Sequence, residues 1–217
     1  AGGQDHALGL AGRPRRVKHH AGAVVIQRGA PRLQFPLEPD ARGQTLGLVS
    51  FGNIGRAMAK IAAGFEFNIL AFDPFVSQDI ADPYGVTMVD QETLFKESDF
   101  VSCHAPLTTR TYHLIGEQDF RHMKSSSHFI NTGRGPVVDE AALIKALQEG
   151  WIAGAGLDVF EHEPAVNPKL LTLDNVILLP HMSSATFEGR VDMGDKVVLN
   201  IQSYIDGHTP PDRVISD

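Results

Sequence analysis

Seven short apolar runs, separated by segments that also contain polar residues, place the strongest constraint on the fold of this 217-residue chain. The runs are apolar throughout rather than alternating, which is the pattern of strands that are buried on both faces. Segments with helical spacing of apolar residues lie between them, so the order predicts an α/β fold, a doubly wound parallel sheet with helices on its faces. The runs cover residues 45–51, 67–73, 85–89, 100–106, 127–132, 152–160 and 176–181.

Helices are predicted most clearly where the sequence also marks their ends. The segment 53–65 has apolar residues near helical spacing directly after the first run. A second helix is predicted to begin at a capping residue, Asp139, and to end at Gly150. Residues 184–207 predict a long C-terminal helix, and Asp5 to Leu10 a possible short one.

The chain divides into three parts by composition. Residues 1–41 are rich in proline, glycine and arginine and predict an irregular segment with a possible leading helix. Residues 42–184 contain the regular alternation and are predicted to form the main domain, and residues 185–217 the C-terminal helix and tail.

Overall charge and composition exclude several classes of function. A formal net charge of −7 argues against nucleic acid or an anionic membrane as the main partner. The single cysteine, Cys103, cannot form an intramolecular disulfide, which fits a reducing compartment. Because no apolar stretch is long enough to cross a bilayer and the first residues do not resemble a signal peptide, we expect a soluble, cytoplasmic protein.

A partial glycine motif joins the first apolar run to the first helix. Dinucleotide-binding turns have the pattern G-x-G-x-x-G, and here Gly52 and Gly55 fill the second and third positions while Ser50 stands at the first. Asp73 lies 18 residues after Gly55, near the spacing of an acid that binds a ribose. The alternative is that the glycines only pack a helix on a sheet and Asp73 only caps a turn before Pro74. Strand, turn, helix and acid in this order favour a Rossmann-type domain, and the charge of Asp73 favours NAD over NADP.

Polar side chains follow three later apolar runs. Arg134, Asp158 and His181 each come at the end of a predicted strand, and Glu161 and Glu163 lie in the loop after Asp158. In an open parallel sheet, ligands bind outside the carboxyl ends of the strands, so these side chains are expected at one edge. Taken singly, each could be a solvated, turn or core residue. Together they suit hydride transfer to or from a 2-oxo or 2-hydroxy carboxylate.

Each residue type in this set has a chemical use. Arg134, between two glycines, can present its guanidinium bidentately to a small carboxylate. A histidine can exchange a proton near neutral pH, and a carboxylate bonded to it would fix its tautomer and favour its charged form. His104 follows another strand and is expected to line the cofactor cleft rather than to bind a metal. Since no histidine or cysteine pair has metal-ligand spacing, we predict no metal site.

At this point the chain resembles the D-isomer-specific 2-hydroxyacid dehydrogenases, a family that includes phosphoglycerate dehydrogenases and glyoxylate/hydroxypyruvate reductases. The resemblance extends from about Arg42 to the C-terminus and is carried by many motifs in the family's order. They are RGQTLGLVSFGNIGRAMA, FDPF, CHAPLTTRTYHLI, INTGRGPVVDEAAL, GAGLDVFEHEP and LLPHMSSAT.

The resemblance implies a role for each site residue. Arg134 is expected to orient the substrate carboxylate and keto oxygen, and His181 to act as the acid/base with Glu163 as its partner. It implies NAD as cofactor, a small 2-hydroxy or 2-oxo acid as substrate, and a homodimer formed through the cofactor domain. The residues expected at the cofactor are Ser50, Gly52, Asn53, Ile54, Gly55, Asp73, Pro74, His104, Ala105, Pro106, Thr111, Thr132, Gly133, Asp158, Ser183 and Ser184.

The chain departs from the family in length as well as at Ser50. Family members place roughly a hundred further residues before this region, and these fold with the C-terminal helix into a substrate domain. The chain therefore resembles the cofactor part of such an enzyme, with most of the N-terminal substrate domain missing. Two functions follow as hypotheses: an NAD-dependent dehydrogenase, or a catalytically idle NAD-binding or NAD-sensing interaction module.

Overall fold

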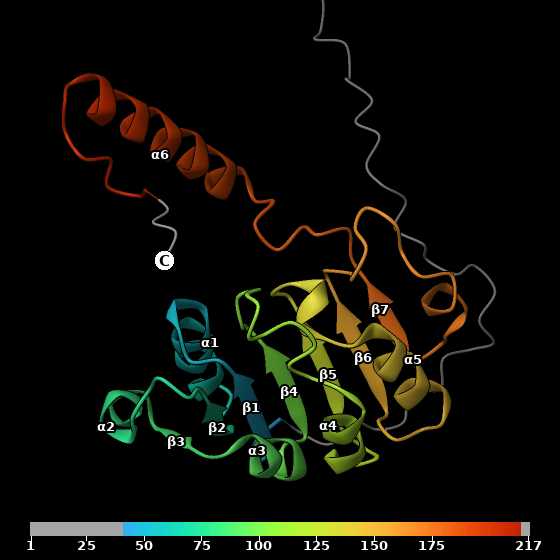
Figure 1. Ribbon diagram of the computed structural model, residues 1–217. Helices are drawn as coiled ribbons and strands as arrows, with labels where there is room; N and C mark the ends of the chain where they lie inside the picture. The colour runs from blue at the N-terminus through green and yellow to red at the C-terminus, as the bar shows by residue number, and fades with distance from the viewer. Residues whose placement is uncertain (1–40, 214–217) are drawn as a thin grey trace, which may run out of the picture.

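The computed structural model describes residues 41–213, which contain one parallel sheet of seven strands in the order β3-β2-β1-β4-β5-β6-β7 (Figure 1). The chain adds strands on one side of β1 and then returns to add β4 to β7 on the other. This arrangement confirms the doubly wound α/β fold predicted from the sequence. The short helix expected over Asp5 to Leu10, and almost all of the predicted segment 1–41, lie outside the described residues.

Every predicted apolar run contains one strand, and every strand ends before its run does. The last residues of each run leave the hydrogen-bonded ladder and begin a loop at the carboxyl edge of the sheet. The strands are β1 (Thr45–Val49), β2 (Asn68–Phe72), β3 (Val86–Met88), β4 (Phe100–Cys103), β5 (His128–Asn131), β6 (Gly154–Leu157) and β7 (Val176–Leu178).

The helices include those that the sequence marked and others that it did not. The cap at Asp139 is confirmed, since its carboxylate accepts a hydrogen bond from the Ala142 N–H at 3.0 Å. The helices are α1 (Asn53–Ala63), α2 (Gln78–Ala81), α3 (Gln91–Glu97), α4 (Glu117–His122), α5 (Glu140–Gln148) and α6 (Phe187–Ile205), with the 3₁₀ turns η1 (Asp82–Tyr84), η2 (Gly135–Val137) and η3 (Leu170–Thr172).

Helix α6 differs from the others because none of its residues is buried. In Figure 1 it lies away from the sheet, and a long non-helical segment joins it to β7. The sheet and the helices that pack on it thus lie within residues 42–184. The division at residue 185, and the packing of α6 on a substrate domain, stay predictions.

Two apolar clusters cover opposite faces of the sheet. In β1, Leu46 and Leu48 point to the face that packs on α1, while Val49 points to the other face, which α3, α4 and α5 cover. This alternation follows from the period of two in a strand. Both faces of β1 are therefore buried, as its continuous apolar character predicts. On the α1 face of the later strands burial is less complete than predicted, since Ile130 is only partly buried and Ile177 is 69% exposed.

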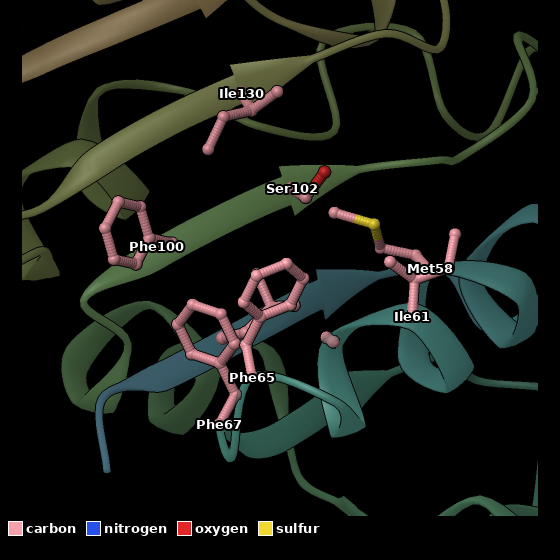
Figure 2. A pocket seen from close by; sticks show the side chains of 9 residues that line it. Met58, Ile61, Phe65, Phe67, Phe100, Ser102 and Ile130 are labelled. Carbon is pink, nitrogen blue, oxygen red and sulfur yellow. The ribbon is translucent and has the colours of Figure 1, made fainter. Parts of the chain in front are cut away.

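An open apolar pocket of about 200 Å³ lies on the α1 face of the sheet. Figure 2 shows five of its lining residues: Phe65, Phe67, Phe100, Met58 and Ile130. Phe100 is the first residue of β4, so the pocket lies toward the amino ends of the strands. It is therefore separate from the carboxyl edge, where ligands of parallel sheets bind.

The turn between β1 and α1 forms with Ser50 in the left-handed region, at a φ of 76°. Glycine adopts this conformation readily, whereas a side chain there is strained, which explains why the usual motif has glycine at this position. The turn is also tight: a Cβ on Gly55 would lie 2.5 Å from the Ser50 carbonyl oxygen. Serine at the first position therefore still permits the turn, at the cost of local strain.

Gly135 is required by a close approach of two loops rather than by its own backbone angles. A Cβ at this position would lie 1.9 Å from the carbonyl oxygen of Phe160, far inside van der Waals contact. The backbone that follows Arg134 is thus packed directly against the backbone that follows β6. This contact fixes the spacing between the loops that carry Arg134 and Glu163.

We predict that Gly135→Ala lowers the free energy of unfolding by about 2 kcal/mol or more, because the added methyl group overlaps backbone that cannot move alone. Urea unfolding followed by circular dichroism measures the change. Gly156→Ala is the matched control, since a Cβ on Gly156 meets no atom within 4 Å. Equal stability of the two variants would contradict the role assigned to Gly135.

A second prediction concerns the strain at Ser50. Ser50→Ala and Ser50→Gly both remove the hydroxyl, but only glycine relieves the left-handed backbone, so the glycine variant is expected to be more stable by about 1 kcal/mol. The same unfolding experiment compares the two. If alanine is tolerated as well as glycine, the backbone at Ser50 is not strained.

Candidate active site at the carboxyl edge of the sheet

The register of the parallel strands aligns the loops that carry the predicted site residues. Asn131 of β5 pairs with Leu157 of β6, which pairs in turn with Leu178 of β7. Each loop therefore begins at the same level of the sheet. Arg134, Asp158 and His181 lie one to three residues beyond these strand ends.

His181 and Glu163 form a hydrogen-bonded pair at this edge. The Nδ1 atom of His181 lies 2.8 Å from Oε2 of Glu163, and Oε1 of Glu163 accepts the Phe160 N–H at 3.0 Å. Both side chains remain partly open to solvent, with 45% of His181 and 34% of Glu163 exposed. The bond at Nδ1 leaves Nε2 of His181 for proton exchange with a ligand.

The charge on Glu163 is stabilised by its surroundings. Partial burial acts to raise the pKa of Glu163, but the hydrogen bonds from His181 and Phe160 and the positive charges of His181 and Arg134 outweigh it. The pKa therefore lies below its ordinary value of 4.5. Glu163 is consequently a carboxylate at neutral pH, and its Oε2 accepts a hydrogen bond from Nδ1–H of His181.

Asp158 holds the loop that carries His181. Its buried carboxylate accepts the N–H groups of Met182 and Ser183, each at 2.8 Å. Burial acts to raise the pKa of Asp158, yet the hydrogen bonds from Met182 and Ser183 and the charge of His181 leave it lowered. These bonds fasten the backbone beside His181, whose φ of 50° is in the left-handed region. The expected position of Asp158 beside the nicotinamide stays a prediction.

Arg134 is exposed and lies close enough to Glu163 for its charge to lower the pKa of that carboxyl. Its Nη1 atom donates to the Gly133 carbonyl at 2.7 Å. A guanidinium has five N–H donors, so this one bond leaves donors for a carboxylate. The short segment Gly133 to Gly135 thus carries a cation whose charge acts on Glu163.

The glycine turn leaves space where a phosphate is expected. A Cβ on Gly52 would meet no protein atom within 4 Å, so protein packing does not account for this glycine. Gly52, Asn53 and Ile54 are exposed at the start of the 11-residue helix α1, whose first N–H groups have no intrahelical partners. A pyrophosphate close to the backbone fits this arrangement, because such a helix end favours an anion.

Asp73 connects the end of β2 to the same turn. One carboxylate oxygen accepts the Phe51 N–H at 3.0 Å and the Ser50 hydroxyl at 3.2 Å, and the other accepts the Phe75 N–H at 2.9 Å. Asp73 therefore supports the turn in addition to the ribose-binding role predicted from its spacing. That role remains a prediction.

The loop after β4 lies beside the turn. His104 is partly buried, and this burial lowers its pKa, so it is neutral at physiological pH. Its Nε2 lies 3.1 Å from the Ser102 hydroxyl oxygen. Burial raises the pKa of Cys103 to about 11, so its thiol is protonated. The Thr111 hydroxyl donates to the Pro106 carbonyl and holds the loop closed. These contacts suit a wall of a cofactor cleft.

The other predicted cofactor residues also lie in loops at this edge. Thr132 follows β5, Pro74 follows β2, and Ser184 follows the Asp158-bound loop. Ala105 is buried beneath the loop after β4, with its carbonyl 3.3 Å from the position of a Gly133 Cβ. Contacts of these residues with a cofactor stay predictions.

Sequence reasoning missed one polar cluster next to the site. Nε2 of His113 lies 2.8 Å from Oε1 of Glu161, and Glu161 also exchanges hydrogen bonds with Glu140. The three residues are far apart in sequence and no local pattern connects them. The loop DVFEHEP contains two glutamates. The family resemblance implied Glu163 as the partner of His181, and the two side chains do lie together, whereas the bond between Glu161 and His113 is seen only in the folded chain.

Within residues 41–213 no cluster of three histidine, cysteine, aspartate or glutamate side chains is arranged to hold a metal ion. In the same part of the chain, no helix has the length and apolar character needed to cross a membrane.

The protein-family model described as D-isomer specific 2-hydroxyacid dehydrogenase, NAD binding domain, matches residues 14–183 of this chain. The chain is 51% identical over 176 residues to a glyoxylate reductase of Thermococcus litoralis, covering 81% of this chain and 53% of that protein. It is 50% identical over 176 residues to a glyoxylate reductase of Korarchaeum cryptofilum, with the same shares covered.

Solved structures show the same likeness. A glyoxylate reductase from Paecilomyes thermophila superposes with a TM-score of 0.74 at 37% identity, over 80% of this chain and 53% of that one. D-lactate dehydrogenase with NAD⁺ from Lactobacillus jensenii superposes with a TM-score of 0.72 at 33% identity, over 80% and 56%. The chain thus spans about half the length of the curated relatives it matches. Because the family model covers the glycine turn and the loops that carry Arg134, Asp158 and His181, the chain belongs to the D-isomer specific 2-hydroxyacid dehydrogenases and contains their NAD binding domain.

Proposed function

We propose that this chain binds NAD(H) and takes part in the reversible reduction of a small 2-oxo acid to the 2-hydroxy acid. The observation that carries the proposal is the His181–Glu163 hydrogen bond of 2.8 Å with the Arg134 cation beside it. A binding module without chemistry has no need of all three groups. The relatives named glyoxylate reductase support a small 2-oxo acid of this class.

The chain's own residues account for binding of the two reactants. The turn at Gly52 and the first N–H groups of α1 hold the pyrophosphate, and Asp73 holds the adenosine ribose. Arg134 pairs with the substrate carboxylate and places the keto oxygen near His181. When NADH is bound, it supplies the hydride that is added to C2 of the substrate.

His181 completes the reaction by moving one proton. Its Nε2–H donates a proton to the oxygen on C2 as that oxygen gains charge, and the product is a hydroxyl group. Glu163 accepts the Nδ1–H of the same ring, which fixes the tautomer and stabilises the imidazolium. In the oxidative direction, Nε2 of His181 takes the proton back from the hydroxyl group.

The homodimer through the cofactor domain and the cytoplasmic location also stay predictions from the family resemblance and composition.

Nucleotide binding is tested first, by fluorescence titration with NADH and NADPH. We expect NADH to bind more tightly, because the charge of Asp73 repels a 2′-phosphate. Asp73→Asn keeps the side-chain shape and should reduce this preference by roughly 5- to 10-fold, equivalent to about 1 to 1.4 kcal/mol. Failure of the wild-type chain to bind either nucleotide would exclude both the dehydrogenase and the idle NAD-binding module.

Turnover is tested by following NADH oxidation with glyoxylate, hydroxypyruvate and pyruvate. His181→Ala is expected to lower kcat by about 100-fold or more, with NADH affinity unchanged, since it removes the proton donor. His162→Ala is the matched control, because His162 is an exposed histidine next to Glu163 in the chain and has no assigned role in the reaction. Tight NADH binding with no turnover by the wild-type chain on any of these acids would favour the idle module.

The lowered pKa of Glu163 predicts how its contribution to stability depends on pH. A carboxyl whose pKa is lower in the folded state stabilises the fold above its ordinary pKa, and this contribution disappears as the pH falls through the lowered value. Glu163→Gln should therefore be less stable than wild type at pH 6, and the difference should shrink as the pH falls below 4.5 toward 3. Urea unfolding across this range measures it, and a difference independent of pH would contradict the assignment.

A further inference from the structure

His113 has an unusual backbone conformation for a residue that the reaction does not use. Among residues 41–213, only four residues other than glycine have a positive φ, and they are Ser50, Glu66, His113 and His181. Two of the others, Ser50 and His181, lie in the site described above. A side chain in the left-handed region is strained and persists only where surrounding contacts hold it. At His113 the φ is 49°, so the contacts that hold it deserve explanation.

The backbone around His113 is tied to the loop that carries Arg134. The His113 N–H donates to the Pro136 carbonyl at 2.9 Å, two residues after Arg134. The Ile115 N–H donates to the Val137 carbonyl at 3.1 Å, which continues the same contact. The segment 113–115 thus lies alongside η2 and restrains the backbone that follows Arg134.

The side chain of His113 is tied to the other loop of the site. Its Nε2 atom lies 2.8 Å from Oε1 of Glu161, while Oε2 of Glu161 accepts the Glu140 N–H at 3.3 Å. The Glu161 N–H donates in return to the Glu140 carboxylate at 3.1 Å. Directly before Glu161 in the chain is Phe160, whose N–H holds Glu163. His113 therefore restrains the backbone from which the partner of His181 projects.

The bonds of His113 to Pro136 and to Glu161 both lie close to the contact between the loop after β5 and the loop after β6. There, Gly135 packs against the Phe160 carbonyl so closely that no Cβ fits. Little tolerance exists at such a contact, because neither backbone can shift without the other. A residue that bonds to both sides is therefore able to set the position of Arg134 relative to Glu163.

We propose that His113 is a positioning residue of the dehydrogenase site, which keeps Arg134 and the His181–Glu163 pair at their working separation. The inference rests on the proposed function, because its effect is exerted on catalysis. His113 acts through its bonds to Pro136 and Glu161 rather than on either reactant directly. A displacement of about 1 Å between reacting groups is enough to lower a rate by roughly 100-fold, so a modest shift of either loop is measurable.

Two substitutions separate the side-chain bond from the backbone strain. In His113→Asn the residue tolerates the left-handed region, but its amide is too short to reach Glu161 from the same Cα. In His113→Gln the terminal amide nitrogen occupies a place similar to Nε2 and restores the bond, although glutamine tolerates the left-handed region less well. Recovery of activity by glutamine would therefore follow from the bond to Glu161 and not from the backbone.

The experiment measures kcat and KM of the 217-residue chain with the 2-oxo acid that gives the fastest turnover, together with NADH affinity and Tm. We expect His113→Asn to lower kcat/KM by about 10-fold or more, with both a raised KM for the acid and a lowered kcat. NADH affinity should remain within about twofold, because His113 bonds to Pro136 and Glu161, whereas Asp73 holds the glycine turn. His113→Gln should recover most of the loss.

The possible outcomes distinguish three situations. If His113→Asn lowers Tm but leaves kcat and KM unchanged, His113 is only structural and the inference is overturned. If glutamine fails to recover activity while asparagine loses it, the Glu161 bond is not the cause and the inference is again overturned. If the wild-type chain binds NADH but turns over no 2-oxo acid, the proposed function itself fails, and the positioning role fails with it.

Discussion

Parallel hydrogen bonding between neighbouring strands is the constraint on which the site depends. The ladder from β4 to β7 keeps corresponding strand ends level, so loops from distant parts of the sequence begin at one edge. Helices α3, α4 and α5 stabilise the ladder by burying the apolar side chains of one of its faces. Without that register, Arg134 and His181 would be two polar residues 47 positions apart in the sequence.

Carboxylates that accept backbone N–H groups convert this edge into a defined geometry. Asp73 accepts N–H groups at the glycine turn, Asp158 accepts them beside His181, and Glu163 accepts the Phe160 N–H while it bonds the imidazole. A carboxylate held in this way loses little by leaving bulk water, since hydrogen bonds replace its hydration. The same bonds that hold the loops also keep Asp158 and Glu163 ionised, as the lowered pKa of each indicates.

Close backbone contacts and strained residues occur in the same loops. Gly135 lies against the Phe160 carbonyl, and Gly55 lies against the Ser50 carbonyl. The left-handed residues Ser50, His113 and His181 each lie in a loop after a strand and bond to their surroundings through side chain or backbone. Such strain is stable only when neighbouring contacts outweigh it, which the paired loops of this edge provide.

The sequence by itself determined the fold class, the seven strands and the identity of the candidate catalytic groups. It did so because wholly apolar runs, helix caps and a glycine turn are local patterns with few structural solutions. The predicted strands extended too far at their carboxyl ends, because an apolar residue just after a strand cannot be told from a strand residue by its sequence. The glycines beside Arg134 indicated a tight turn, but their sequence did not show that Gly135 is pressed against Phe160.

Only the tertiary structure decided which polar groups meet. It showed that Glu161 bonds to His113, while Glu163, two residues later in the same loop, bonds to His181 as the family resemblance implied. It also showed Asp73 and Asp158 supporting backbone turns in addition to the roles that their positions predicted. The physical reason is that these bonds join residues separated by 18 to 48 positions, so their geometry depends on strand register and loop packing rather than on any local pattern.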